Sequence, residues 1–326
     1  MTGRFARRTA IAAVGAAMLP RHLKAQQTLA PVIGILDSSA ATALKLSAFY
    51  EGLKVEGFFR NQNLTVEYHS AEGDYARLSE LAADLVNRRV ALITALGNPA
   101  ALAAKAATTK IPVVFAVSAN PIEIGLVASL NHPGANMTGV AGMAAGREQK
   151  RLELLYAAIP TASGLGFLLN PENSNRDAQI NDALASAQKV GVQIKPIRAS
   201  TGRDLSNVFA ELVQSRAGGL VIADDEFFLG ASAELGSLAA RHSTPAIFQG
   251  TAFAAAGGLM SYGTRLAELY HQAGAYTGLI LAGAAPADLP IYQSTAVEMI
   301  VNLRSAKSLG ITLPQAIIDQ ATTLIR

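Results

Sequence analysis

Polar side chains follow directly after many of the apolar, strand-like runs of this sequence. Most of them are neutral hydroxyl and amide groups, which exchange hydrogen bonds with a small molecule and fix its orientation. In a parallel sheet such residues meet beyond the carboxyl ends of the strands, where ligands bind. The predicted ligand-binding residues are Asp37, Ser38, Ser39, Asn98, Pro99, Ser118, Asn120, Asn170, Asp225, Gln249 and Tyr262.

The charges among these residues restrict the ligand. Only Asp37 and Asp225 are charged, and no arginine or lysine sits at any of these strand ends. A buried charge without a partner is costly. We therefore predict a neutral or cationic polar solute, or an amino acid whose carboxylate is held by backbone N–H groups and hydroxyls alone. Asp225 is expected to pair with an ammonium group if the ligand has one.

The run Asp224-Asp225-Glu226 is the only acidic cluster at a predicted strand end. Such a cluster can bind a metal ion or an ammonium group. Carboxylates are also favoured at the start of a helix, where the backbone dipole is positive. The sequence leaves both interpretations open.

The sequence contains no motif for catalysis or for a cofactor. Cysteine is absent, which excludes thiol catalysis, disulfides and cysteine-bound zinc. The five histidines lie far apart without the spacing of metal ligands. No G-x-G-x-x-G turn, P-loop or G-x-S-x-G elbow occurs. Since no nucleophile and base are paired either, we predict no catalytic residue, no metal ligand and no cofactor.

The elements that position these residues are clearest in residues 90–121. An apolar run at 90–95 (VALITA) and another at 111–117 (IPVVFAV) flank an alanine-rich, helix-prone segment at 100–109. Continuous apolar strands separated by helices indicate a parallel sheet covered on both faces. Each strand ends in an Asn-Pro turn, Asn98-Pro99 or Asn120-Pro121, which either lines a binding crevice or only punctuates the fold.

Two consecutive series of strands and helices predict an α/β protein with two doubly wound parallel-sheet lobes joined by three crossovers. Gly-, Pro- and Asn-rich sequence predicts the first crossover at 126–140, and the others are expected near 257–263 and 288–291. The expected N-terminal lobe comprises residues 30–140 plus 259–288. The expected C-terminal lobe comprises residues 141–258 plus 289–326.

The N-terminus is typical of an export signal. Arg4, Arg7 and Arg8 precede a short apolar run at 9–19, and Ala25 offers a cleavage point. Residues 1–25 are therefore predicted to be a signal peptide removed on export to the periplasm, by the general or the twin-arginine route. They carry five basic residues of a chain with net charge +3, which leaves −2 and excludes an electrostatic case for nucleic acid.

Several motifs together resemble the solute-binding proteins of bacterial ABC transporters that include tryptophan- and tyrosine-binding members. They lie at 103–115, 125–130, 133–139, 238–242, 256–263, 286–290 and 301–310. The resemblance covers residues 30–326. It implies a type I periplasmic-binding fold, no enzymatic activity, and ABC permease subunits of the inner membrane as partners of a monomeric chain.

The sequence departs from this family's pattern where a ligand would sit. The family often has Thr-Pro in place of Asn98-Pro99 and Asp-Pro in place of Asn120-Pro121, and it usually carries charged residues near 229–232 and 249–251. Asp225 does match a family aspartate. The expected function is capture of a small polar solute, such as an amino acid or a related compound, for an ABC importer. An exported sensor subunit and an α/β enzyme such as an isomerase are the alternatives.

Overall fold

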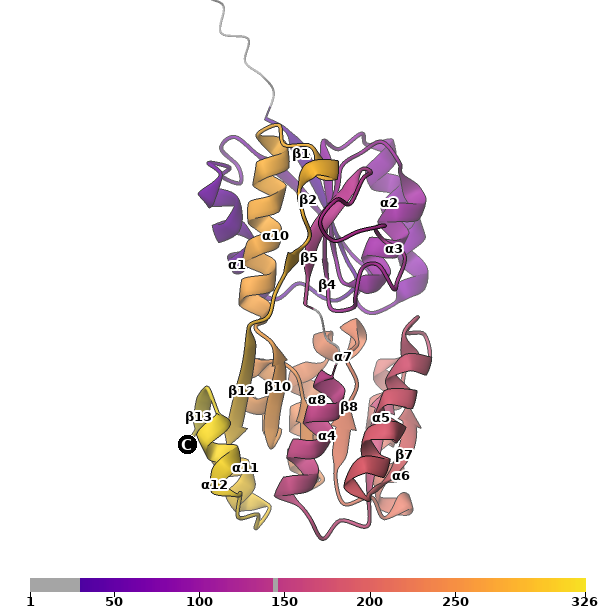
Figure 1. The fold of residues 1–326 in the computed structure, drawn as a ribbon, viewed down its shortest axis with the longest axis vertical. Coiled ribbons are helices and arrows are strands. Elements are labelled where there is room, and N and C mark those ends of the chain that lie inside the picture. Colours follow the sequence, from indigo (N-terminus) through magenta and orange to yellow (C-terminus); the bar gives the residue numbers. More distant parts are fainter. Residues whose placement is uncertain (1–29, 143–145) are drawn as a thin grey trace, which may run out of the picture.

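The computed structural model describes residues 30–142 and 146–326, which form two sheets with helices on both faces (Figure 1). Each sheet and its helices form one lobe, so the predicted fold class is confirmed. The predicted signal peptide, residues 1–25, lies outside the described residues. Within the described ranges, no helix is both long and apolar enough to cross a membrane.

The first lobe is built on a six-stranded sheet in the order β11-β5-β4-β3-β1-β2, with parallel neighbours throughout. β3 and β4 are buried at every position, which explains their continuous apolar sequence. The strands are β1 (Val32–Asp37), β2 (Thr65–Ser70), β3 (Leu92–Leu96), β4 (Val113–Val117), β5 (Met137–Ala141) and β11 (Tyr292–Gln293).

Four main helices cover the two faces of this sheet, and alternate strand residues point to each face. α2 and α3 pack with Leu36, Ile93 and Phe115, whereas α1 and α10 pack with Ile35 and Val114. The helices are α1 (Ala43–Val55), α2 (Leu78–Asn87), α3 (Asn98–Ala107) and α10 (Leu266–Leu281), with short 3-10 turns η1 (Tyr75–Arg77) and η2 (Pro286–Asp288).

Glycines allow α1 and α10 to run side by side, although more than 200 residues separate them in the sequence (Figure 1). A Cβ atom on Gly52 would lie 1.9 Å from the carbonyl oxygen of His271, and one on Gly274 would lie 2.0 Å from that of Phe49. The backbones therefore approach too closely for any side chain at these two positions.

The second lobe is built on a seven-stranded sheet in the order β13-β12-β10-β9-β8-β6-β7. Its neighbours are parallel except at the antiparallel pair of β10 and β12. The strands are β6 (Gly164–Leu169), β7 (Gln193–Arg198), β8 (Leu220–Ile222), β9 (Ala246–Phe248), β10 (Met260–Thr264), β12 (Val297–Asn302) and β13 (Thr323–Ile325).

Helices also cover both faces of the second sheet. α4 and α5 pack with Phe167 and Val221 on one face, and α6 and α8 pack with Leu168 and Ile222 on the other. The helices are α4 (Arg147–Ala158), α5 (Arg176–Val190), α6 (Gly202–Ser215), α7 (Glu226–Gly230), α8 (Ser232–Arg241), α9 (Thr251–Ala255), α11 (Leu303–Ser308) and α12 (Gln315–Gln320).

The chain passes between the lobes at three places, but not where the sequence suggested. The crossover expected at 126–140 was placed too early, because Met137–Ala141 pairs with β4 as strand β5 of the first sheet. The glycine and asparagine residues of this stretch obscured the strand. The chain changes lobe after β5, again at Arg265 between β10 and α10, and a third time at 294–296 between β11 and β12.

Sheet pairing also divides the chain differently from the expected lobe boundaries. Residues 259–264 were expected in the N-terminal lobe, but β10 pairs with β9 and β12 in the second sheet. Residues 289–293 were expected in the C-terminal lobe, but β11 pairs with β5 in the first sheet. Both errors concern short strands next to a crossover, where the local sequence does not reveal which sheet supplies the hydrogen-bond partner.

Candidate functional site

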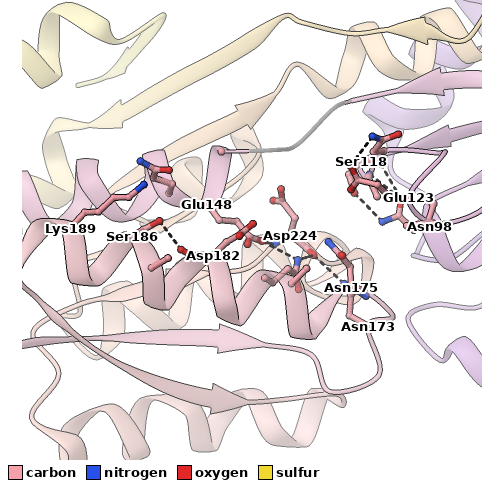
Figure 2. A pocket seen from close by; sticks show the side chains of 18 residues that line it. Asn98, Ser118, Glu123, Glu148, Asn173, Asn175, Asp182, Ser186, Lys189 and Asp224 are labelled. Atoms are coloured by element: carbon pink, nitrogen blue, oxygen red, sulfur yellow. Dashed lines mark hydrogen bonds between the residues drawn. The ribbon is translucent and has the colours of Figure 1, made fainter. Parts of the chain in front are cut away.

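A cavity of about 360 Å³ opens where the two lobes face each other (Figure 2). Its first-lobe wall comes from the start of α3 and the segment after β4. Its second-lobe wall comes from α4, α5 and the end of β8. The lining residues are Asn98, Ser118, Ala119, Asn120, Glu123 and Ile124 of the first lobe, and Gly146, Glu148, Gln149, Asn173, Asn175, Ala178, Gln179, Asp182, Ala185, Ser186, Lys189 and Asp224 of the second.

The first-lobe wall is held together by Asn98. Its Oδ1 accepts hydrogen bonds from the backbone N–H groups of Ser118 at 3.1 Å and Ala119 at 3.3 Å, and its Nδ2 donates to Ser118 Oγ at 3.3 Å. Gly97, with φ of +96°, turns the chain from β3 into α3 and so places Asn98 at the cavity. Pro99 occupies the first turn of α3.

Asn120, which follows Ser118 in the segment after β4, completes this wall. Its Nδ2 donates to Glu123 Oε1 at 2.9 Å, and its Oδ1 accepts from the N–H of Ile122 at 3.0 Å. The structure thus brings together the predicted residues Asn98, Ser118 and Asn120 from the ends of two neighbouring strands. Both Asn-Pro turns border the cavity.

The second-lobe wall contains a buried ionic network that the sequence did not predict. Arg151 is 0% exposed, and its Nη1 lies 2.8 Å from Asp224 Oδ1 and donates to the carbonyl of Tyr262 at 3.2 Å. Its Nη2 lies 3.8 Å from Glu148 Oε1. Glu148 Oε1 also accepts from the N–H of Asp224 at 2.9 Å. Burial and the neighbouring Asp224 raise the pKa of Glu148 to about 7, while Arg151 opposes the shift.

Gln179 links α5 to this network. Its Nε2 donates to Glu148 Oε1 at 2.9 Å and to the carbonyl of Asp224 at 2.7 Å. Together with Gln179, the N-cap Asn175 and the α5 residues Asp182, Ser186 and Lys189 follow one another at intervals of three or four residues and form one polar helix face along the cavity (Figure 2).

Asp225 is occupied by contacts within the protein. It is the N-cap of α7, and Oδ1 accepts from the N–H groups of Phe227 and Phe228. Asn170 Nδ2 donates to Oδ1 at 3.1 Å, and Asn173 Nδ2 donates to Oδ2 at 2.9 Å. Burial raises the pKa of Asp225, and these hydrogen bonds oppose the shift. The geometry favours the helix-start interpretation of this carboxylate over pairing with an ammonium group.

The three acidic residues at the end of β8 therefore do not form one cluster. Asp224 pairs with Arg151, Asp225 caps α7, and Glu226 extends toward the first lobe, where its Cγ and Cδ approach Gly97. Burial raises the pKa of Glu226 to about 7, Lys45 lowers it and Asp37 raises it. Among the described residues, no group of three or more His, Asp or Glu side chains is arranged to hold a metal ion.

Tyr75 makes a direct bridge between the lobes. Its hydroxyl lies 3.0 Å from Asp225 Oδ2 and accepts from the N–H of Phe227 at 3.0 Å. A second cavity of about 520 Å³ lies beside this bridge and is lined by Tyr75, Asn170, Thr201 and Phe227, among others. The predicted residue Asn170 therefore borders this second cavity and holds Asp225.

Asp37, Ser38 and Ser39 are structural in this arrangement. Lys45 Nζ lies 2.8 Å from Asp37 Oδ2 and donates to Ser39 Oγ at 2.7 Å, with both charged side chains buried. Ser38 Oγ accepts from the N–H of Ala100 at 2.9 Å and so supports the start of α3. Lys45 lies in α1, eight residues after Asp37, which is why a search of strand ends missed it.

The last two predicted residues, Gln249 and Tyr262, are not among the residues that line the cavity. Gln249, at the end of β9, packs against Gly263. Tyr262, in β10, offers its carbonyl to Arg151. The residues that sequence reasoning missed, Glu148, Gln179 and Lys189, lie on helices. The regular spacing of polar residues along α5 was the available signal.

Two lobes with parallel sheets, three crossovers and a polar cavity between them define a type I periplasmic-binding fold. The chain belongs to the family of ABC transporter substrate binding proteins, whose family model matches residues 31–325. The resemblance inferred from the sequence is thereby confirmed.

The chain is similar to a tyrosine-binding protein of Clostridioides difficile, with 25% identity over 261 residues that cover 80% of this chain and 75% of that protein. It is also similar to the solved structure of an ABC domain from Streptococcus pneumonia in complex with L-Trp. That structure has 26% identity and a TM-score of 0.80, covering 90% of this chain and 99% of the other.

A further solved structure is the ligand-free, open form of a substrate binding protein with adhesive properties from Clostridium difficile. It has 25% identity and covers 90% of this chain and 99% of the other, but its TM-score is 0.61. At nearly equal identity and coverage, the L-Trp complex superimposes on this chain better than the open form does.

Proposed function

We propose that this chain captures a small polar solute between its two lobes and delivers it to an ABC importer. The observation that carries the proposal is the cavity of about 360 Å³ whose walls come from both lobes. A ligand held by both walls favours the closed arrangement over the open one, because it gains contacts only when the lobes meet.

An amino acid or a related amine is the class of solute that we propose. Two relatives are described as a tyrosine-binding protein and as a complex with L-Trp. The cavity offers amide, hydroxyl and carboxylate groups from both lobes, which suits a ligand with several hydrogen-bond donors. The proposal involves no reaction and no cofactor.

Two observations support closure around the ligand. The Tyr75 hydroxyl reaches Asp225 and Phe227 across the gap, so the lobes already touch. The TM-score is higher with the L-Trp complex than with the ligand-free, open relative, which also supports a closed arrangement. Export and cleavage near Ala25 would bring the protein to the periplasm, where such proteins meet their permeases.

Native and denaturing mass spectrometry of protein purified without refolding tests this proposal. We expect one small polar molecule per chain, retained in the native spectrum and lost on denaturation. Adding the identified compound back to stripped protein should raise the melting temperature, because ligand binding to the folded state stabilises it. Native protein that carries no solute, and whose melting temperature no amino acid or amine raises, would contradict the proposed function.

A further inference from the structure

The middle part of the cavity, formed by Glu148, Gln179 and Asp224, contains a buried amide oxygen without a hydrogen-bond donor in the described part of the chain. Gln179 is 5% exposed and lines the cavity, yet its Oε1 has no hydrogen-bond partner among the described residues. A buried polar atom of this kind is costly unless a ligand or water satisfies it.

The orientation of the Gln179 amide follows from its partners. Its nitrogen faces Glu148 Oε1 and the carbonyl oxygen of Asp224, and both of these atoms only accept hydrogen bonds. Exchanging the amide oxygen and nitrogen would place oxygen against oxygen twice. The unpaired atom is therefore an acceptor, and a donor from a ligand or a water molecule satisfies it.

Glu148 presents a second free acceptor. The N–H of Asp224, the amide of Gln179 and Nη2 of Arg151 all approach the same oxygen, Oε1. Oε2 remains for a donor in the cavity. One carboxylate oxygen of Asp224, Oδ1, is likewise occupied, since Arg151 Nη1 lies 2.8 Å from it.

The lining of the cavity is acidic when all groups are ionised. It contains the carboxylates of Glu123, Glu148, Asp182 and Asp224 and the ammonium of Lys189. The cations Arg147 and Arg151 and the carboxylate Asp225 are buried nearby. Four lining carboxylates against one lining ammonium favour a ligand with a positive charge.

Lys189 lies at the far end of the cavity from this group of acceptors. It is ten residues beyond Gln179 on α5, which corresponds to about 15 Å along a helix. In Figure 2, Lys189 lies at one end of the row of side chains, and Glu148 and Asp224 lie in the middle. Among the described residues, the ammonium of Lys189 makes no ion pair or hydrogen bond with these acceptors.

We propose that Glu148, Gln179 and Asp224 form a subsite for a cationic nitrogen, so that the transported solute carries an ammonium or a related group bound at this middle part of the cavity. The inference rests on the proposed function and names the chemical class of its ligand. Because Glu148 faces Asp224, Arg151, Asp182 and the more distant Arg147, a bound cation also stabilises its ionised form. Binding then releases a proton near neutral pH.

A charge series on one scaffold tests the subsite. Tyramine, L-tyrosine and 3-(4-hydroxyphenyl)propionate share a phenol ring but carry a cation, a zwitterion and an anion. We expect the first two to bind. The anion should bind at least about tenfold more weakly, because it lacks the donor that the acceptors need. Calorimetry in phosphate and in Tris at neutral pH should give different apparent enthalpies for the ammonium compounds, as proton release requires.

The variant Glu148→Gln, with exposed Glu234→Gln as the matched control, localises the effect. Glu148→Gln should weaken binding of the ammonium compounds about tenfold to a hundredfold and abolish the buffer dependence, whereas Glu234→Gln should change neither. Equal affinity for the anion and the cation, or no binding by any of the three, would overturn the inference. So would unchanged affinity in a folded Glu148→Gln protein.

These failures differ from failure of the proposed function. A retained solute that lacks a cationic nitrogen would overturn the subsite but leave solute capture intact. A protein that binds no solute of any charge would contradict both. The wild-type charge series decides the question even if Glu148→Gln does not fold.

Discussion

Asp225 shows how one residue can match a prediction in position and differ in role. The sequence placed it correctly at a strand end, and its charge suggested a partner for an ammonium group. The structure instead surrounds the carboxylate with donors from Asn170, Asn173 and the first turn of α7. A strand end followed by a helix supports both roles, and only the side-chain partners distinguish them.

Replacing Asp225 should therefore affect stability. Asp225→Ala removes an N-cap and leaves buried amide groups unpaired, so we expect the free energy of unfolding to fall by about 2–4 kcal/mol. Asp225→Ser keeps a capping oxygen and should lose roughly half as much. Urea denaturation without ligand measures both. Unchanged stability together with lost solute affinity would show that Asp225 contacts the ligand instead.

At the scale of elements, strands were easier to predict than the side chains that helices supply. The continuous apolar runs of β3 and β4, each closed by an Asn-Pro turn, correctly predicted that Asn98, Ser118 and Asn120 meet. Glu148 and Gln179 contribute to the same cavity from α4 and α5. Their inclusion depends on how those helices are rotated and packed on the second sheet, which a strand-end argument does not address.

The short strands next to crossovers were the other weakness. β10 and β11 flank crossovers, and each pairs with a sheet that its sequence neighbours did not indicate. Pairing in a sheet is decided by partners distant in sequence, so local periodicity does not determine it. Likewise, the packing of the long helix α10 against α1 depends on contacts between residues distant in sequence, at Gly52 and Gly274.

The N-terminus of α7 makes the stability of the protein depend on pH. Glu226 has a pKa raised to about 7 by burial, compared with about 4.3 in an unfolded chain. Between these values the folded state binds more protons, so the free energy of unfolding is highest at the acidic end and falls as the pH rises toward 7. Glu148, whose pKa is also raised to about 7, acts in the same direction.

Between pH 5 and 7, we expect the fall in the free energy of unfolding to be about 1–3 kcal/mol smaller in Glu226→Gln than in wild type. The double variant with Glu148→Gln should reduce this fall further. Urea denaturation at several pH values measures the slope, and Glu234→Gln is the control for a simple change in net charge. A slope that is identical in wild type and both variants would show that neither carboxyl is buried as described.

At the scale of the whole molecule, two lobes meet through few polar contacts. Three crossovers and the Tyr75 bridge connect them, and a polar cavity occupies part of the interface. Small hinge changes at crossovers of this kind produce large movements of the lobes. A solute that contacts both walls then contributes a substantial part of the free energy of closure.

Small-angle X-ray scattering with and without the solute recovered from the native protein tests this central claim most directly. Stripped protein should scatter as a more open particle, and saturating solute should reduce the radius of gyration toward that calculated from the closed structure. A reduction that requires the solute and reverses on its removal is the result that we predict. Superimposable scattering profiles at saturation would contradict capture of a solute by closure of the two lobes.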